Sequence, residues 1–167
     1  MTDCNIEWVG TDDKTRHERE SETGEQANRR RRERALRNIF EGGQFTNDLG
    51  LRLVSWDESG TVVVALPHRE SLGNGQGAAH GGVIAALMDT AGTAAVWCGH
   101  DFTRARGRRN GTVSMSVNYA SSARLDDLVA HATCVRRGGS MNFAEIRVEG
   151  AEGRLVAHGI LAYQISD

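Results

Sequence analysis

A histidine followed by two glycines forms the most informative cluster of the sequence. His80-Gly81-Gly82 precedes an apolar, alanine-rich run, whose length and composition predict a buried helix over residues 82–98. The free N–H groups at the start of a helix form a small positive pole, and glycine lets a ligand approach the backbone closely. The sequence therefore predicts a site for a carbonyl oxygen or an oxyanion at the start of this helix.

A single carboxylate lies inside the same predicted helix. Asp89 is the only charged residue between Glu70 and Asp101. In an otherwise apolar helix, its burial would cost several kcal/mol unless the carboxylate were paired or faced a cavity. Asp89 is therefore either a hydrogen-bonded or surface-facing helix residue, or a nucleophile or general base beside an activated carbonyl.

The segments around this helix have mainly the pattern of strands. Residues 49–56 and 61–66 flank a polar, glycine-ended turn, and residues 112–119 alternate polar and apolar side chains. Three more strands are predicted over residues 128–135, 142–148 and 155–165, and with residues 112–119 they would form a four-stranded meander. We predict an α+β domain in which a curved antiparallel sheet of about five to six strands wraps one long buried helix.

Charge is distributed unevenly along the chain of 167 residues. The first 34 residues contain nine acidic and eight basic side chains, whereas the other 133 contain 25 charged residues. Such a segment buries too little apolar surface to fold alone, so residues 1–34 are predicted to be disordered or loosely helical and residues 35–167 to form the domain. The arginine run at 29–34 could bind phosphate, but nearby glutamates favour a solvated helix start.

Composition also argues against several classes of protein. No run approaches the roughly 18 apolar residues of a membrane helix, and the N-terminus lacks the basic start and apolar core of a signal peptide. The three cysteines are far apart, and neither they nor the histidines show metal-ligand spacing. A net charge of −2 gives no general attraction to nucleic acid or membranes. We expect a cytoplasmic protein without a metal site.

The spacing of these residues resembles a known family. Asn74, His80-Gly81-Gly82 and Asp89, followed by the strand over residues 112–119, resemble the PaaI-like (phenylacetic acid degradation-related) branch of the hotdog-fold acyl-CoA thioesterases over roughly residues 36–165. The resemblance implies hydrolysis of an acyl-CoA to a free acid and CoA with no cofactor. It also implies a homodimer with shared active sites, which usually assembles into a homotetramer.

The resemblance further implies roles at the start of the helix. The Gly81 N–H would polarise the thioester carbonyl, and His80 and Asn74 would shape and orient the same side of the site. His80 could equally be a structural residue that caps the helix or bonds the loop.

On the other side of the carbonyl, the resemblance implies that Asp89 of the partner chain activates water or attacks directly. Thr112 lies where the family has a small hydroxyl residue that helps to hold the water. Ser114 is its rival, because the alignment of this strand has no fixed anchor.

Contacts to the rest of the substrate are expected at two places. Glycine at position 82 would let substrate approach the helix start, and a turn rich in arginine and glycine would contact the pantetheine and phosphates of CoA. The substrate-binding or CoA-binding candidates are therefore Gly82, Ser114, Arg136, Arg137, Gly138 and Ser140. The turn could instead be a solvated loop. The acyl pocket is expected near Leu72, Val83, Met88, Trp97 and Phe102.

A second function belongs to a different class. The same scaffold could be a non-catalytic acyl-CoA binding or sensing protein, with the charged N-terminal segment as its interaction arm. The presence of Asp89 favours an enzyme. Dehydratases of this fold do not match, because the only proline is Pro67 and no aspartate precedes His80 in its loop.

Overall fold

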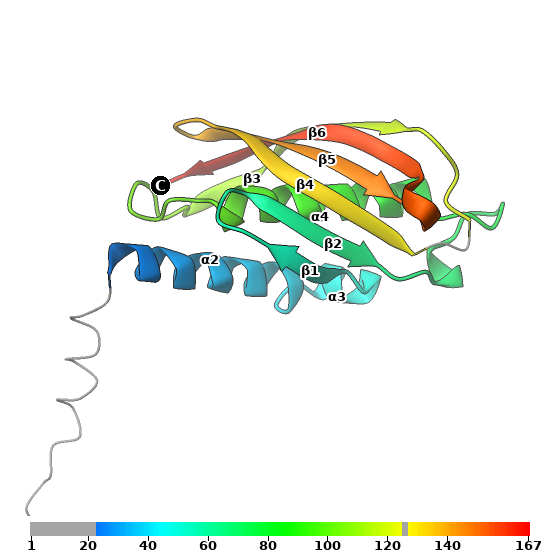
Figure 1. Ribbon diagram of the computed structural model, residues 1–167, viewed down its shortest axis with the longest axis horizontal. Coiled ribbons are helices and arrows are strands. Elements are labelled where there is room, and N and C mark those ends of the chain that lie inside the picture. Colours follow the sequence, from blue (N-terminus) through cyan, green and yellow to red (C-terminus); the bar gives the residue numbers. More distant parts are fainter. Residues whose placement is uncertain (1–22, 125–126) are drawn as a thin grey trace, which may run out of the picture.

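The computed structural model describes residues 23–124 and 127–167 (Figure 1). Its helices are α2 (Gly24–Phe40), α3 (Gln44–Leu49) and α4 (Gly81–Cys98), with short 3-10 turns η1 (Glu70–Leu72) and η2 (Ala151–Gly153). Its strands are β1 (Arg52–Trp56), β2 (Thr61–Leu66), β3 (Arg109–Tyr119), β4 (Leu128–Arg137), β5 (Met141–Glu149) and β6 (Leu155–Ser166).

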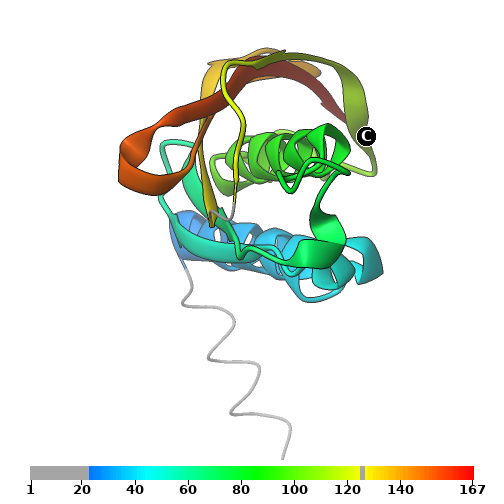
Figure 2. The ribbon, with the colours of Figure 1, turned by 90° about the vertical axis from the view of Figure 1, so that its right-hand side faces the viewer.

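The six strands form one antiparallel sheet in the order β1-β2-β4-β5-β6-β3. The sheet arches over α4, and α2 lies on the opposite side of that helix (Figure 2). This arrangement confirms the predicted α+β hotdog architecture. The predicted four-stranded meander is wrong, because β3 does not neighbour β4. It pairs with β6 and forms one edge of the sheet, and β1 forms the other.

The core lies between α4 and the concave face of the sheet. Leu87, Met88 and Ala91 of α4 are fully buried, as are Ile146 of β5 and Leu161 of β6. α4 is long and apolar enough to cross a membrane by length and composition. Because the sheet covers most of its surface, however, these apolar residues are those expected of the central helix of a packed domain.

The N-terminal helix crosses the predicted domain boundary. α2 begins with a capping box in which the Gln26 N–H donates to Thr23 Oγ1 and the Thr23 N–H donates to Gln26 Oε1. The helix buries Leu36 and Phe40 and runs unbroken through positions 34 and 35. The domain therefore starts before residue 35. The part of the predicted disordered segment that precedes Thr23 lies outside the described residues.

Contacts with the loop after α4 hold the first half of α2 in place. Asn28 Nδ2 donates to Asp101 Oδ1 at 3.1 Å, and Asn28 Oδ1 accepts from the Phe102 N–H at 3.1 Å. Arg32 Nε donates to the His100 carbonyl at 2.9 Å. Through these hydrogen bonds, polar and charged side chains of α2 become part of the packed domain.

A short helix replaces the start of the first predicted strand. The sequence predicts a strand over residues 49–56, but α3 extends to Leu49 and β1 begins at Arg52. Gly50 adopts the left-handed conformation, with φ of 71°, and ends α3. The segment predicted as one strand, residues 49–56, therefore contains the last residue of α3 as well as β1.

Two glycines of the β3–β6 pair offer a test of packing. A Cβ on Gly159 would overlap the Ser116 carbonyl oxygen, whereas a Cβ on Gly111 would have no heavy atom of another residue within 4 Å. We expect Gly159→Ala to lower the free energy of unfolding by about 1–3 kcal/mol. The matched Gly111→Ala change should stay within about 0.5 kcal/mol of the parent. Urea denaturation of both variants checks this expectation, and equal midpoints would contradict the close contact at Gly159.

Candidate active site

His80 caps the start of α4. It is the N-cap residue, with φ of −65° and ψ of 137°, and its Nδ1 accepts the Gly82 N–H at 2.9 Å. Its carbonyl oxygen accepts the N–H groups of Val83 and Ile84. A neutral imidazole that accepts at Nδ1 carries its proton on Nε2, so the outer edge of the exposed ring is a donor.

This cap changes the expectation for Gly82. Its N–H is already donated to His80, so it is not available to a ligand. A Cβ on Gly82 would lie 3.0 Å from His80 Nδ1, so glycine here leaves room for the ring. Gly82 thus supports the cap rather than the substrate.

The Gly81 N–H remains free at the start of the helix. Within residues 23–124 and 127–167 it donates to no acceptor. The Gly81 carbonyl accepts a hydrogen bond from Tyr119 Oη at 2.9 Å, which fixes the peptide from the β3 side. Tyr119 was not singled out from the sequence, where it appears only as the last residue of an alternating strand. The geometry leaves one backbone donor at the positive end of α4.

Asn74 lies in the loop that leads to this helix start. Its Oδ1 accepts the N–H groups of Gln76 at 2.9 Å and Ala78 at 3.2 Å, which closes the loop. A cavity of about 360 Å³ is lined by residues that include Asn74, Gly81 and Tyr119. The structure therefore brings Asn74 and Gly81 to one cavity, with His80 at the first position of the same turn.

Asp89 and Thr112 form a second group. Thr112 Oγ1 of β3 donates to Asp89 Oδ1 of α4 at 2.7 Å. Among the hydrogen bonds of the described residues, Ser114 makes none with Asp89, and a register shift separates it from Thr112. Of the two hydroxyl candidates, Thr112 is thus the one in contact with the carboxylate. Thr112 occupies Oδ1, and among the described residues no donor hydrogen-bonds to Oδ2.

One chain does not bring the two groups together. Gly81 and Asp89 are eight residues apart on α4, which corresponds to about 12 Å along the helix axis. A carbonyl carbon must lie within roughly 3.5 Å of the attacking atom while its oxygen lies about 3 Å from the donor. Along one helix, this separation is too long for direct attack by Asp89 on a carbonyl that is bound at Gly81.

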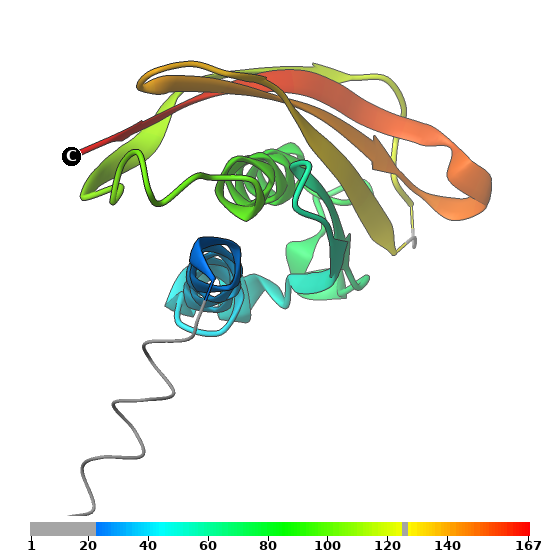
Figure 3. The same cartoon turned by 60° about the vertical axis from the view of Figure 1, so that its left-hand side comes forward.

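A larger cavity of about 730 Å³, here called the α2–α4 cavity, is lined by neighbours of Asp89 and Thr112 rather than by the pair itself. Thr93, one turn after Asp89, lines it, and so does Tyr163, the strand partner of Thr112. Figure 3 shows α2 below α4 and the loop that follows the C-terminal end of α4. Burial, and to a lesser extent the charge of Asp89, raises the pKa of Tyr163.

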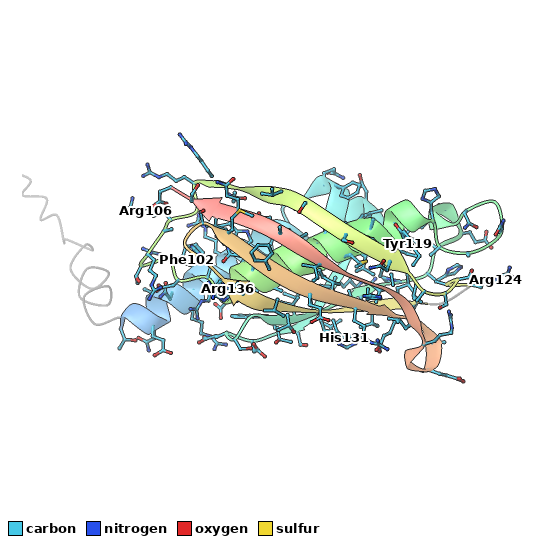
Figure 4. The ribbon with its side chains drawn as sticks, turned by 90° about the horizontal axis from the view of Figure 1, so that it is seen from above. Phe102, Arg106, Tyr119, Arg124, His131 and Arg136 are labelled. Carbon is cyan, nitrogen blue, oxygen red and sulfur yellow. The ribbon has the colours of Figure 1, made fainter. Side chains whose placement is uncertain are left out.

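The α2–α4 cavity agrees only in part with the predicted acyl pocket. Trp97 and Phe102 line it as expected. Leu72 and Val83 instead line a separate space of about 10 Å³, and Met88 is fully buried in the core. Figure 4 shows Phe102 and Arg106 at one end of the molecule and Tyr119 and Arg124 at the other, so the two cavities open toward opposite ends of α4.

The arginine turn has a structural function at the far end of α4. The Arg137 guanidinium donates to the carbonyls of Val96 at 2.8 Å, Ala95 at 3.2 Å and Ser59 at 3.5 Å. A cation there satisfies the last carbonyls and the negative end of the helix. Arg137 therefore holds this helix end, and its binding to CoA stays a prediction. Arg136 is exposed, and its side chain makes no hydrogen bond or ion pair with any residue of the described chain.

Backbone contacts account for the rest of this turn. The Gly138 N–H donates to the Met141 carbonyl at 2.8 Å, and a Cβ on Gly138 would lie 2.5 Å from that oxygen. The Ser140 carbonyl accepts the Ile165 N–H at 2.8 Å. Gly138 therefore closes the β4–β5 hairpin, whereas Ser140 joins its turn to β6.

The histidine, cysteine and acidic side chains of the described residues form no metal site. No group of three or more histidine, cysteine or acidic side chains suited to a metal occurs within residues 23–124 and 127–167. Burial raises the pKa of the Cys98 thiol to about 12 and also raises that of Cys134. Both thiols are therefore protonated and poorly nucleophilic at neutral pH.

Sequence comparison gives the family. The thioesterase superfamily model matches residues 76–157. Human acyl-coenzyme A thioesterase 13 is 31% identical over 102 residues, which cover 60% of this chain and 69% of the human protein. The chain belongs to the thioesterase superfamily.

Two further matches of this thioesterase superfamily member are a sequence relative and a solved structure. A Halobacterium salinarum protein with an esterase name is 37% identical over 92 residues, a match that spans 53% of this chain and 59% of that protein. The Escherichia coli PaaI protein from the phenylacetic acid degradation operon has the same fold, with a TM-score of 0.72, 19% identity, and coverage of 83% of this chain and 96% of PaaI. The resemblance to hotdog thioesterases with PaaI-like relatives is thus confirmed.

The superfamily match includes His80, Gly81, Asp89 and Thr112. It excludes Asn74, α2 and the β1–β2 hairpin. The α2 wall of the larger cavity therefore belongs to the part of this thioesterase superfamily member outside the matched range.

Proposed function

We propose that this protein is a PaaI-like acyl-CoA thioesterase that hydrolyses an acyl-CoA to a free acid and CoA in a homodimer with shared active sites. The observation that carries the proposal is the pairing of a free Gly81 N–H with a Thr112-bound Asp89, about 12 Å apart on one helix. Each group is half of a hydrolytic site, and a second chain supplies the other half. The acyl-CoA thioesterase name of the human relative supports the choice of substrate.

The edge of the sheet supports this dimer. β3 is an eleven-residue edge strand with exposed Val113 and Tyr119, and such an edge readily pairs with another chain. Antiparallel pairing of two β3 strands would place two α4 helices side by side in opposite directions. Gly81 of one chain would then approach the partner's Asp89. Exposed Val135, Phe143 and Ile160 on the strands supply apolar surface for a homotetramer.

The chemistry follows from these positions. The thioester carbonyl oxygen accepts the Gly81 N–H, with the Nε2 edge of His80 beside it, so negative charge that develops on this oxygen is stabilised. Asp89 takes a proton from water on Oδ2, and the resulting hydroxide adds to the carbonyl carbon. The carbon–sulfur bond then breaks, and CoA leaves as the thiolate, which takes up the proton. Alternatively, Asp89 attacks first, and water hydrolyses the resulting anhydride. Neither route uses a cofactor.

Complementation between two inactive variants tests the shared site. Asp89→Asn and Gly81→Pro each damage a different half, so each homodimer should have very low activity. In a mixed dimer, one site contains both defects and the other contains neither. Random mixing of refolded chains should therefore restore about a quarter of wild-type activity on a reactive acyl-CoA.

Each variant refolded alone is the control and should stay inactive. No recovery in mixtures that contain mixed dimers by mass spectrometry would contradict the shared site. Binding of acyl-CoA by the wild-type protein without turnover would favour the non-catalytic binding function instead.

A further inference from the structure

Three arginines give the lining of the α2–α4 cavity a positive charge. Its lining includes Arg31 and Arg34 from α2 and Arg106 from the loop after α4, and no described acidic residue lines it. Arg31, Arg34 and Asn38 are spaced by three and four residues, so they lie on one face of α2. The cavity is therefore cationic on the side opposite α4.

Two of these arginines are uncommitted. Within the described parts of the chain, the guanidinium groups of Arg34 and Arg106 make no hydrogen bond or ion pair. Among residues 23–124 and 127–167, the Arg31 side chain donates to the Phe102 carbonyl alone, at 3.4 Å. Other arginines of the same helix are neutralised, since Arg32 pairs with Glu58 at 3.3 Å and Arg37 lies 3.8 Å from Glu41.

Part of the remaining wall consists of three aromatic side chains that contact one another or a neighbouring asparagine. Trp97 and Phe102 stack with ring centroids 5.7 Å apart. Trp97 Nε1 donates to Tyr163 Oη at 3.3 Å, and Tyr163 Oη donates to Asn110 Oδ1 at 3.0 Å. A pocket with an apolar body and a few convergent polar groups suits a ligand with an apolar middle and a polar end.

The position of Asp89 fixes the direction of such a ligand. Under the proposed function, the thioester carbon lies at Asp89, and the cavity begins one turn further along α4 at Thr93. The aromatic wall suits acyl carbons better than the amides of pantetheine. The acyl group thus extends into the α2–α4 cavity, and its far end approaches the arginines.

We propose that the α2–α4 cavity selects acyl groups that end in a carboxylate, with Arg34 and Arg106 binding that carboxylate. The inference rests on the proposed thioesterase function and adds the substrate class. Guanidinium groups bind carboxylates through paired, charge-assisted hydrogen bonds, and this geometry favours a dicarboxylic acyl-CoA over its monocarboxylic equivalent.

Adipoyl-CoA and hexanoyl-CoA provide a matched test, because they share the chain length and CoA and differ in the terminal group. We expect wild-type kcat/KM to be at least about tenfold higher for adipoyl-CoA. Arg34→Met and Arg106→Met keep most side-chain volume but remove the charge. Each should lower kcat/KM for adipoyl-CoA by about 10-fold to 100-fold and leave hexanoyl-CoA nearly unchanged. Arg37→Met, which removes an arginine of α2 outside the cavity lining, is the control and should alter neither substrate.

The contrary outcomes are distinct. Equal losses for both substrates would mean that the arginines bind the phosphates of CoA and would overturn the inference, as would equal wild-type rates with adipoyl-CoA and hexanoyl-CoA. If no acyl-CoA is hydrolysed, the proposed function fails. Calorimetric titration with adipate and hexanoate then still decides the preference of the cavity. Binding of adipate that is lost in Arg34→Met supports the inference. Equal binding of both acids, or no binding of either, overturns it.

Discussion

Replacing Gly81 with proline should lower kcat by about 10²–10³-fold without unfolding the protein, because proline removes the one N–H that the site needs. The first position of a helix is where proline is best tolerated. Gly81 is that position in α4, and His80 before it already has the extended conformation that a following proline requires. The loss is measured in steady-state kinetics with a reactive acyl-CoA, and circular dichroism confirms the fold.

Gly81→Ala is the matched control for this change. It keeps the N–H, and an added Cβ would lie 3.5 Å from the Tyr119 ring, an ordinary contact. The alanine variant should therefore stay within a few-fold of wild type. If the proline variant were as active as the alanine variant, the Gly81 N–H would not be the group that polarises the carbonyl.

Asp89→Asn should lower kcat by about 10²–10⁴-fold, because the carboxamide can neither take a proton from water nor attack a carbonyl. The fold should persist. Asparagine Oδ1 can still accept the hydrogen bond that Thr112 donates at 2.7 Å, so the helix and β3 keep their contact. Single-turnover kinetics measure the loss, and thermal unfolding checks that stability is retained.

Thr112→Ala provides a graded comparison. It removes the hydrogen bond but keeps the carboxylate, so its loss of activity should be smaller than that of Asp89→Asn. Turnover at the wild-type rate in the asparagine variant would rule out Asp89 as base or nucleophile. A Thr112→Ala variant with an unchanged rate, combined with a slow Ser114→Ala variant, would transfer the role to Ser114.

Local sequence patterns predicted the parts of the fold that depend on neighbouring residues. The alanine-rich run became α4, and the alternation of residues 112–119 became most of β3, because periodicity and propensity act along the chain. The position of β3 at the edge, next to β6, could not be predicted from spacing. It depends on pairing with a strand that begins more than 35 residues later in the chain.

The candidate site residues also divide into those that a local sequence pattern indicates and those that depend on distant contacts. His80, Gly81 and Asp89 were found because a glycine pair and a lone carboxylate are unusual around a buried helix. Arg137 could not be assigned from its type, since an arginine in a turn suits a phosphate as well as the end of a helix. Its contact with the Val96 carbonyl joins positions 41 residues apart, which no local pattern contains.

The two helices α2 and α4 lie in different parts of the sequence, and this affects how substrate preference can change. The hydrolytic candidates lie on α4 and β3, within the superfamily match, whereas Arg31, Arg34 and Asn38 belong to a helix that precedes it. Exchanging the exposed residues of that one helix alters the wall of the larger cavity and leaves the Asp89–Thr112 pair in place. Under the proposal above, changes in α2 alter which acyl groups this protein accepts, whereas the Asp89–Thr112 pair is unaffected.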